Sequence, residues 1–401
     1  MNRNLGIVSI SFLILSCIVE ARPGAFDITS FNTAGGNDVS QALLEAWKQA
    51  CASPEPSSVV IPAGTFLASA VKFEGPCKAP IDLQIKGTLK APEDHTLFKD
   101  DGWLTFHNVD RLTLSGGGIF DATGAKTWSL NECHKTISCD SFPISLFFNL
   151  VTNSVIQDIT SKDSKFFHVN IIGSRNVTFQ HITISAPGDS KNTDGIHIGR
   201  STEINVLDST IATGDDCVSL GDGSKQVKIE KVTCGPGHGI SIGSLGKYPN
   251  EEPVEGVFVK NCTLIDTTNG VRIKTWPGSP DGVATDMHFE DIIVQNVQNP
   301  ILIDQEYCPW NNCKQGQPSK IKISKVSFNN IKGTSALPLA VVLVCSTSIP
   351  CDGVEVGNVD LTYSGPQGPI ATKCSNIKPI FTGTQNPPIC TNSTQPTAPA
   401  P

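Results

Sequence analysis

The sequence predicts an all-β protein and, within that class, a single right-handed parallel β-helix with a short N-terminal capping helix. Three observations carry this prediction. Charged residues are only 17% of the 401 residues, and 35 glycines and 27 prolines interrupt the chain, which disfavours long helices. An apolar phrase of eight residues recurs along the chain. A second strand phrase follows several copies of the first, in the same order, as a coiled chain requires.

The first residues have the features of an export signal. Arg3 precedes an apolar run from Leu5 to Val19, and the tripeptide ending at Ala21 has the small-x-small pattern that signal peptidase accepts. We expect residues 1–21 to be removed and the mature protein to be secreted. The run is shorter than the roughly 20 apolar residues of a membrane-spanning helix, so we expect no membrane association after cleavage.

One substantial helix is expected near the start of the mature chain. Asp38-Val39-Ser40-Gln41 resembles a capping box, and Leu43, Leu44 and Trp47 then fall on one face of a helix. A stack of strands has an open apolar end that must be covered. We therefore expect this helix to cap the coil.

The recurring phrase has apolar residues at its third, sixth and eighth positions. Spacing this loose excludes a strict hexapeptide solenoid but suits a parallel β-helix whose turns vary in length. A β-sandwich also has alternating strands, but it gives no reason for two strand phrases to return in the same order. The copies are SVIQDITS at 154, VTFQHITI at 177, INVLDSTI at 204, VKIEKVTC at 227, VFVKNCTL at 257, MHFEDIIV at 287, IKISKVSF at 321 and VEVGNVDL at 354.

No linker divides the mature chain. We expect one catalytic domain over residues 22–390, followed by a disordered Pro/Thr-rich tail over residues 391–401. The sequence offers no self-complementary surface, so a monomer is the default expectation.

Cysteine usage fits an oxidising compartment. Removal of Cys17 leaves 14 − 1 = 13 cysteines, so one thiol must stay unpaired. Sequence alone does not fix the connectivity. Spacing favours six pairs and a buried free thiol at Cys262: Cys51–Cys77, Cys133–Cys139, Cys217–Cys234, Cys308–Cys313, Cys345–Cys351 and Cys374–Cys390. Candidate glycosylation sequons stand at Asn176, Asn261 and Asn392.

The net charge of −8 disfavours binding of nucleic acid, or of any polyanion, through the field of the whole molecule. An anionic ligand would need a local cluster of cations. We expect no cofactor and no metal.

The second strand phrases bring such a cluster together. They are Asp194-GIHIG, Asp215-DCVSL, His238-GISIG, Asn269-GVRIK and Asn299-PILID. Stacked strands lie about 4.8 Å apart, so the first residues of these phrases should form one column, with Asp216 beside Asp215. Arg272 and Lys274 lie two residues apart on one strand and should face the same side.

Each motif also has a purely structural explanation. Asn192-Thr193-Asp194-Gly195, Gly214-Asp215-Asp216 and Gly237-His238-Gly239 suit turns, and Arg272-Ile273-Lys274 alternates like a half-exposed strand. Their coincidence in adjacent turns of the coil favours a site instead. Crowded carboxylates raise at least one pKa, which supplies a general acid while the ionised partners activate water, as in glycoside hydrolysis.

These four motifs, in this order, resemble the polygalacturonase family, glycoside hydrolase family 28, over nearly all of the mature chain. The resemblance implies hydrolysis of α-1,4-galacturonosyl linkages of polygalacturonate (pectin) with inversion. It implies that Asp215 is the general acid, that Asp194 and Asp216 activate water and that His238 tunes the acid. It also implies substrate binding by Arg272, Lys274, Tyr307 and Asn192. The strand spacing alone is nearer the retaining distance of about 5 to 5.5 Å, so inversion rests on the resemblance.

The stretches Gly235–Glu251 and Asn269–Gly278 resemble the plant pollen-type exopolygalacturonases, which release galacturonic acid from the non-reducing end. The insertions Asp121–Pro143 and Leu245–Glu255 are candidate walls for a closed groove. An endo-acting enzyme is the main alternative, because groove closure cannot be inferred from one sequence.

Two other classes remain open. In a pectate lyase, Arg272 or Lys274 would abstract a proton while the aspartates held calcium, but the four-motif set is not the lyase pattern. A non-catalytic carbohydrate-binding β-helix predicts loss of the charged column, which is intact in this chain.

Overall fold

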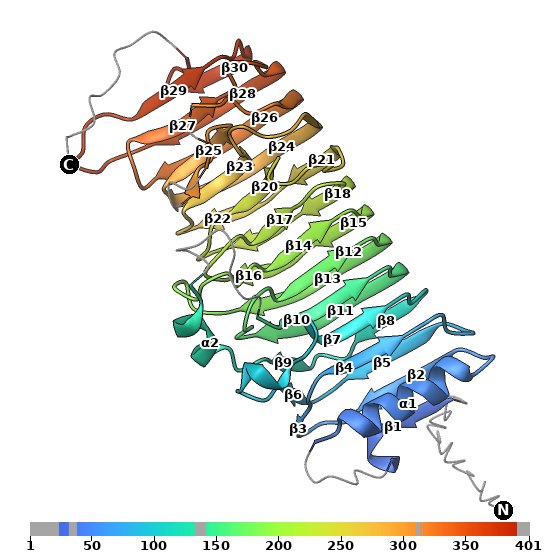
Figure 1. Cartoon of the computed structure of the whole chain (residues 1–401). Helices are drawn as coiled ribbons and strands as arrows, with labels where there is room; N and C mark the ends of the chain where they lie inside the picture. The colour runs from blue at the N-terminus through green and yellow to red at the C-terminus, as the bar shows by residue number, and fades with distance from the viewer. Residues whose placement is uncertain (1–23, 32–37, 133–141, 310–312, 315, 391–401) are drawn as a thin grey trace, which may run out of the picture.

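The computed structural model describes residues 24–31, 38–132, 142–309, 313–314 and 316–390. Over these residues the protein is all-β, with few helices, and forms an elongated stack of strands (Figure 1). All strand pairs within the described part of the chain are parallel, in two sheets. This confirms the predicted all-β class with parallel sheets.

The smaller sheet carries the residues of interest. Each of its strands pairs with the next one along the stack. In that order it contains β4 (Val71–Glu74), β7 (Gly102–His107), β10 (Ile144–Asn149), β12 (Val169–Ile172), β14 (Ile196–Gly199), β17 (Val218–Leu220), β20 (Ile240–Leu245), β23 (Asn269–Thr275), β25 (Asn299–Asp304), β27 (Leu339–Val344) and β29 (Ala371–Ser375).

The larger sheet receives the remaining strands. Between two strands of the smaller sheet the chain crosses to the larger sheet and returns, so that each pass contributes to both. The larger sheet contains β1 (Ala25–Asp27), β2 (Ser57–Ile61), β3 (Thr65–Leu67), β5 (Ile81–Ile85), β6 (Thr88–Lys90), β8 (Leu112–Ser115), β9 (Ile119–Asp121), β11 (Thr152–Lys162), β13 (Arg175–Ser185), β15 (Thr202–Leu207), β16 (Thr210–Ala212), β18 (Lys225–Glu230), β19 (Thr233–Cys234), β21 (Val254–Lys260), β22 (Thr263–Ile265), β24 (Gly282–Val297), β26 (Ile321–Ser335), β28 (Asp352–Thr362) and β30 (Ile380–Asn386).

The repeated apolar phrases of the sequence stack in the larger sheet. The first six, from 154 to 287, lie in the predicted register. The seventh prediction was wrong by five residues, because Met287 pairs with Val326 and not with Ile321, which lies opposite Gly282. Strands β24 and β26 are 16 and 15 residues long, and their apolar alternation runs past the phrase, so the pattern fits two registers.

Apolar side chains of successive turns stack inside the coil. The rings of Phe73 and Phe106 are 4.8 Å apart, and those of Phe106 and Phe148 are 5.0 Å apart. All three are fully buried, and each is opposite the next in register. Offset aromatic stacking adds about 0.5–1.5 kcal/mol to the burial of each pair, which favours this register over a slipped one.

Within the described residues, two α-helices lie outside the sheets. Helix α1 (Ser40–Ala52) packs beside β1 and β2 at the N-terminal end of the stack (Figure 1), where the Trp47 ring is 4.9 Å from Phe73. The predicted capping box is wrong in detail. The Asp38 carboxylate accepts from the amide of Ser40, 2.8 Å away, two residues on and not three. Helix α2 (Ala125–Leu130) belongs to the first predicted insertion. Two short 3₁₀ helices, η1 (Ile28–Ser30) and η2 (His95–Leu97), are also present.

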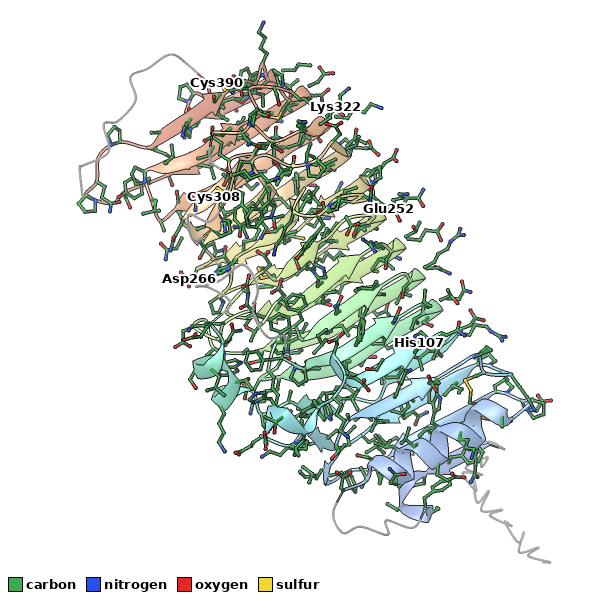
Figure 2. The ribbon with its side chains drawn as sticks, viewed as in Figure 1. His107, Glu252, Asp266, Cys308, Lys322 and Cys390 are labelled. Carbon is green, nitrogen blue, oxygen red and sulfur yellow. A yellow bond between two sulfur atoms is a disulfide. The ribbon has the colours of Figure 1, made fainter. Side chains whose placement is uncertain are left out.

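Five predicted disulfides are confirmed. They are Cys51–Cys77, Cys217–Cys234, Cys308–Cys313, Cys345–Cys351 and Cys374–Cys390. Two of these pairs, marked by Cys308 and Cys390 in Figure 2, lie in the C-terminal part of the stack. Cys262 is a buried free thiol, as predicted, and burial raises its pKa to about 12.

Several predictions fall outside the described residues: the signal peptide, the Cys133–Cys139 pair, the tail and the sequon at Asn392. Within the residues that are described, no helix is both long and apolar enough to cross a membrane.

Candidate active site

A cavity of about 840 Å³ opens on the outer face of the smaller sheet, over β14, β17, β20 and β23. All eight site residues predicted from the sequence line it. They reach it from the turns that precede three strands, from β23 itself and from the segment after β25: Asn192, Asp194, Asp215, Asp216, His238, Arg272, Lys274 and Tyr307.

The predicted column of first residues is wrong by one position. Ile196 of β14 pairs with Val218 of β17, so Asp194 falls opposite Asp216 and not opposite Asp215. The later phrases pair as predicted, with His238 opposite Asn269. The turn before β17 contains one more residue than the repeat suggested, and this extra residue moves Asp215 out of the column.

Asp216 is held by cations. Its Oδ1 accepts from Arg272 Nη2 at 2.7 Å, and its Oδ2 accepts from Lys274 Nζ at 2.9 Å. Ser241 of β20 donates a third bond at 2.8 Å. Burial by itself would raise the pKa of Asp216, but Lys274 and Arg272 lower it to about 2. Asp216 is therefore ionised at every pH at which the protein would work.

Asp194 has the opposite environment. Its side chain is buried, and its carboxylate accepts from the neutral Ser219 hydroxyl, 2.9 Å away. Burial, followed by the charges of Asp215 and Asp216, raises the pKa of Asp194 well above its ordinary value, against the opposing effects of Lys274 and Ser219. Burial and the neighbouring carboxylates thus favour the protonated form of Asp194.

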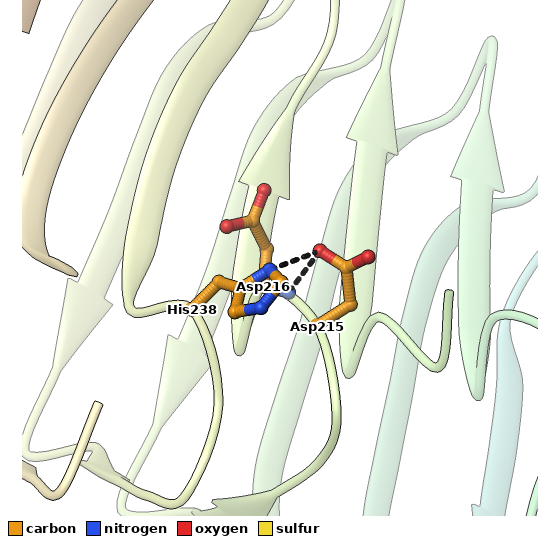
Figure 3. A group of neighbouring side chains, drawn as sticks. All are labelled: Asp215, Asp216 and His238. Carbon is orange, nitrogen blue, oxygen red and sulfur yellow. Dashed lines mark hydrogen bonds and ion pairs between the residues drawn. The ribbon is translucent and has the colours of Figure 1, made fainter. Parts of the chain in front are cut away.

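Asp215 and His238 form a third unit (Figure 3). His238 Nδ1 lies 3.0 Å from Asp215 Oδ1, which also accepts from the amide of Asp216 at 2.7 Å. Asn192 donates to the other carboxylate oxygen at 3.3 Å. Burial opposes protonation of His238, but its bond to Asp215 and the charges of both aspartates raise its pKa.

Two glycines are needed for this close packing. A Cβ on Gly239, where φ is +86°, would lie 2.0 Å from the carbonyl oxygen of Asn269. A Cβ on Gly214 would lie 2.0 Å from the carbonyl oxygen of Ser190. Both distances are far below van der Waals contact, so the glycines beside His238 and Asp215 are steric requirements of the site.

The C-terminal end of the cavity combines aromatic rings with cations. Lys274 Nζ lies 5.4 Å from the centre of the Tyr307 ring, and that ring stands edge-on to Trp276 at 5.7 Å. Lys247 Nζ lies 5.2 Å from the Tyr248 ring, and both residues line the cavity. The predicted insertion Leu245–Glu255 therefore forms part of the wall.

The first insertion reaches the site through Asn131, which donates to Asn192 Oδ1 at 3.0 Å. Residues 133–141 of that insertion lie outside the described residues.

Three polar contacts escaped the sequence analysis: Ser219, Ser241 and His197. All three line up in register on neighbouring strands. The signal was present, because each is a polar residue flanked by apolar ones within the phrases GIHIG, DCVSL and GISIG. Inward and outward positions alternate along a strand, so these residues share the face that carries Arg272 and Lys274.

Asp215, Asp216 and His238 also present donor atoms that all lie within 4.8 Å of one another. Asp216 already accepts from two cationic side chains, so this group does not have the free negative charge that a divalent cation requires. Paired carboxylates whose environments push their pKa values apart, in an open cavity, instead define the site of a glycoside hydrolase.

The chain belongs to the glycosyl hydrolases family 28, whose family profile matches residues 51–387. It is 55% identical over 381 residues to a polygalacturonase of Nicotiana tabacum, covering 95% of this chain and 96% of that one. It is 54% identical over 357 residues to an exopolygalacturonase of Oenothera organensis, covering 89% and 99%. The endo-xylogalacturonan hydrolase of Aspergillus tubingensis has a similar solved structure, with a TM-score of 0.78, 26% identity and coverage of 90% and 100%.

Proposed function

We propose that this protein is a secreted hydrolase of polygalacturonate that acts in the cell wall. The observation that carries the proposal is the cavity in which three aspartates, His238, Arg272 and Lys274 converge. The names of the plant relatives support the same substrate.

Local charge fits an anionic polymer. The protein as a whole carries −8, so attraction of a polyanion depends on cations inside the cavity. Arg272 and Lys274 supply two of them, and the planar guanidinium of Arg272 suits a carboxylate. Lys247 adds a third cation on the wall, and no ion pair joins it to a carboxylate among the described residues.

The proposed reaction divides the labour among the aspartates. Asp215 donates its proton to the glycosidic oxygen as the bond from that oxygen to the anomeric carbon breaks. Water attacks the anomeric carbon from the opposite face and gives its proton to Asp194, while the ionised Asp216 orients that water. His238 beside Asp215 adjusts its acidity, and Asn192 and Tyr307 contact the sugar.

We further propose inversion of configuration, by the resemblance to the family. An inverting enzyme needs room for a water molecule between sugar and base. Asp194 can activate water only in its ionised form. Because its pKa is raised, we expect it to act as the base at a mildly acidic working pH.

We propose an exo mode, with release of galacturonic acid from the non-reducing end. The exopolygalacturonase names among the relatives support it, and Lys247 and Tyr248 of the second insertion line the cavity. An endo mode is the alternative, because relatives named only polygalacturonase are equally similar.

We also propose the handedness of the coil, the role of α1, the bounds of the catalytic domain and the oligomeric state. The winding of the coil is taken to be right-handed, as crossover connections between parallel strands nearly always are, and α1 is taken to cap its N-terminal end. The catalytic domain is residues 22–390, preceded by a cleaved signal peptide, and the mature protein is a monomer.

A product time course tests the proposal. Purified protein is given de-esterified polygalacturonate, and released reducing ends are compared with solution viscosity. We expect galacturonic acid to accumulate while viscosity falls slowly. A rapid loss of viscosity would make the enzyme endo-acting, unsaturated products would make it a lyase, and no turnover between pH 4 and pH 8 would leave a binding module.

A further inference from the structure

A column of polar side chains runs across the smaller sheet beneath the cavity. Asn170, His197, Ser219, Ser241 and Arg272 occupy paired positions on β12, β14, β17, β20 and β23. Ser219 and Ser241 are almost fully buried, with 2% and 0% exposure. Buried hydroxyls need partners on both the donor and the acceptor side, so the direction of each bond can be worked out.

The two serines have different second partners. Ser241 donates to Asp216 and accepts from Arg272 Nε at 3.0 Å, and a guanidinium can only donate. Ser219 donates to Asp194 Oδ2 at 2.9 Å, and its oxygen lies 2.8 Å from His197 Nδ1. An imidazole nitrogen can donate or accept, so the bond between His197 and Ser219 can reverse, whereas the bond between Arg272 and Ser241 cannot.

The direction of the hydrogen bond between His197 and Ser219 depends on the charge of Asp194. When Asp194 is ionised, the single proton of Ser219 points to the carboxylate, so Nδ1 must carry a proton and Nε2 a lone pair. When Asp194 is protonated, it donates to Ser219. The serine then donates to a bare Nδ1, and Nε2 carries the proton.

Nε2 of His197 is on the cavity side. His197 and Gly221 both line the cavity, and a Cβ on Gly221 would lie 3.3 Å from Nε2. No described residue forms a hydrogen bond with Nε2, so this nitrogen is available to water or substrate in the cavity.

We propose that Asp194, Ser219 and His197 form a proton relay between the catalytic carboxylate and the cavity. One proton moves from Asp194 to the Ser219 oxygen, the proton of Ser219 moves to His197 Nδ1, and the proton on Nε2 passes to water in the cavity. The net result is loss of one proton from Asp194 and conversion of His197 from the Nε2-protonated to the Nδ1-protonated tautomer, which must revert before the next cycle, and no oxidation or reduction accompanies it.

The relay rests on the proposed function, in which Asp194 takes a proton from the attacking water and must lose it before the next cycle. It returns Asp194 to the ionised form through Ser219 and His197. His197 and Ser219 are positioning and relay residues in this scheme, because neither contacts the reacting carbon.

The surroundings of His197 favour an exchange between neutral forms. The Phe167 ring lies 5.2 Å from the imidazole, and burial lowers the pKa of His197 to about 4 against the charges of Asp216 and Asp222, with Lys274 adding to the lowering. Asp194 itself faces Asp215, Asp216 and Lys274. An imidazolium would therefore form only in acid, below the range in which the exchange operates.

Nitrogen NMR of the whole protein, labelled with ¹⁵N-histidine, tests the relay without any substrate. The His197 signals are assigned by their loss in His197→Asn. We expect Nδ1 protonated and Nε2 bare at high pH, with exchange to the Nε2-protonated neutral form as Asp194 takes up its proton. The Asp194→Asn variant should show no exchange over that range. A proton on Nε2 at every pH in the wild type would overturn the relay.

Kinetics on polygalacturonate separate a relay from simple positioning. His197→Asn keeps an N–H near the place of Nδ1 but cannot pass a proton, and Ser219→Ala breaks the chain. We expect kcat to fall about tenfold in both, less than the roughly 10²–10⁴-fold supplied by general acid–base catalysis as a whole, with KM little changed.

Ser209→Ala is the matched control, since Ser209 is a buried serine outside the cavity whose hydroxyl donates to the carbonyl of Leu207 at 2.7 Å. It should keep the wild-type kcat. Wild-type kcat and pH profile in His197→Asn would overturn the relay and leave only a positioning role. The NMR result stands even if the wild type hydrolyses no polygalacturonate, so failure of the relay and failure of the proposed function are distinguishable.

Discussion

The two buried carboxylates of the site, Asp194 and Asp216, lie opposite one another on adjacent turns of the coil, yet their environments differ. Each accepts a hydrogen bond from a serine of the following strand, Ser219 or Ser241. Behind Ser241 stands the permanently charged Arg272, whereas behind Ser219 stands the neutral His197. Only the Asp216 side also receives an ammonium group, from Lys274.

This difference shows how a repeating fold produces two functions from one residue type. Strand pairing places the carboxylates alike, and the identity of the next polar residue along the column then fixes one as a permanent anion and leaves the other able to exchange a proton. The cations that the sequence suggested for substrate binding alone are thus also the groups that hold Asp216 ionised.

The largest expected effect is on turnover. Replacing Asp194 by Asn removes the proposed base, so kcat on polygalacturonate should fall about 10²–10⁴-fold, whereas thermal stability should be unchanged or higher because a repelled buried charge is gone. Asp208→Asn, at an exposed carboxylate 3.7 Å from Lys231, is the control for kcat. Near-normal turnover in Asp194→Asn would remove Asp194 from the chemistry.

Replacing the opposite carboxylate, Asp216, by Asn should act mainly on the free energy of unfolding. Asp216→Asn leaves the buried cations of Arg272 and Lys274 without their anion, and breaking a buried pair in this way costs about 3–5 kcal/mol. Urea unfolding would measure the loss, and Asp194→Asn is its matched comparison. Equal stabilities of the two variants would contradict the contrast between the two carboxylates.

Stability against pH should change in opposite directions for the two groups. Asp216 has a lowered pKa of about 2, so its contribution is present above the ordinary carboxyl pKa and is lost as pH falls towards 2. Asp194 has a raised pKa, so its contribution is present below the ordinary value and is lost as pH rises through the raised one. Melting temperatures of wild type and both variants from pH 2 to pH 8 would test these signs, and a wild-type profile that Asp194→Asn leaves unchanged would be evidence against the second.

The smallest effect concerns the limbs of the pH–activity profile. Falling pH protonates Asp194 and removes the proposed base, so the acid limb should lie above the usual carboxyl range. Rising pH deprotonates His238 at a pKa above its ordinary value, so activity should decline there. His238→Gln should lose the alkaline limb while the acid limb stays, and an unmoved alkaline limb would exclude His238 as its source.

Much of this arrangement could be predicted from sequence. The repeated apolar phrases predict the coil, because strands stack only when the same apolar pattern returns in each turn. The polar motifs fall in adjacent turns of that coil. The eight site residues predicted from the sequence therefore all line the cavity.

Register in the turns could not be predicted in the same way. One extra residue before β17 moved Asp215 out of the column, and two long strands allowed Val326 to replace Ile321 as the partner of Met287. A turn is not constrained by the alternation that fixes a strand. The partners of Asp194 and Asp216 were missed for a related reason, because hydrogen bonds across strands depend on register and not on spacing along the chain.

The anomeric form of the first product is the sharpest test of the roles of Asp215 and Asp194, since an acid at Asp215 and a base at Asp194 acting on water must invert the anomeric carbon. Proton NMR of a reaction on de-esterified polygalacturonate, recorded before mutarotation, distinguishes the two anomers. We expect β-galacturonic acid to appear first from the α-linked polymer. Early accumulation of the α-anomer would mean retention through a covalent intermediate and would contradict the assignment of Asp194 as a base.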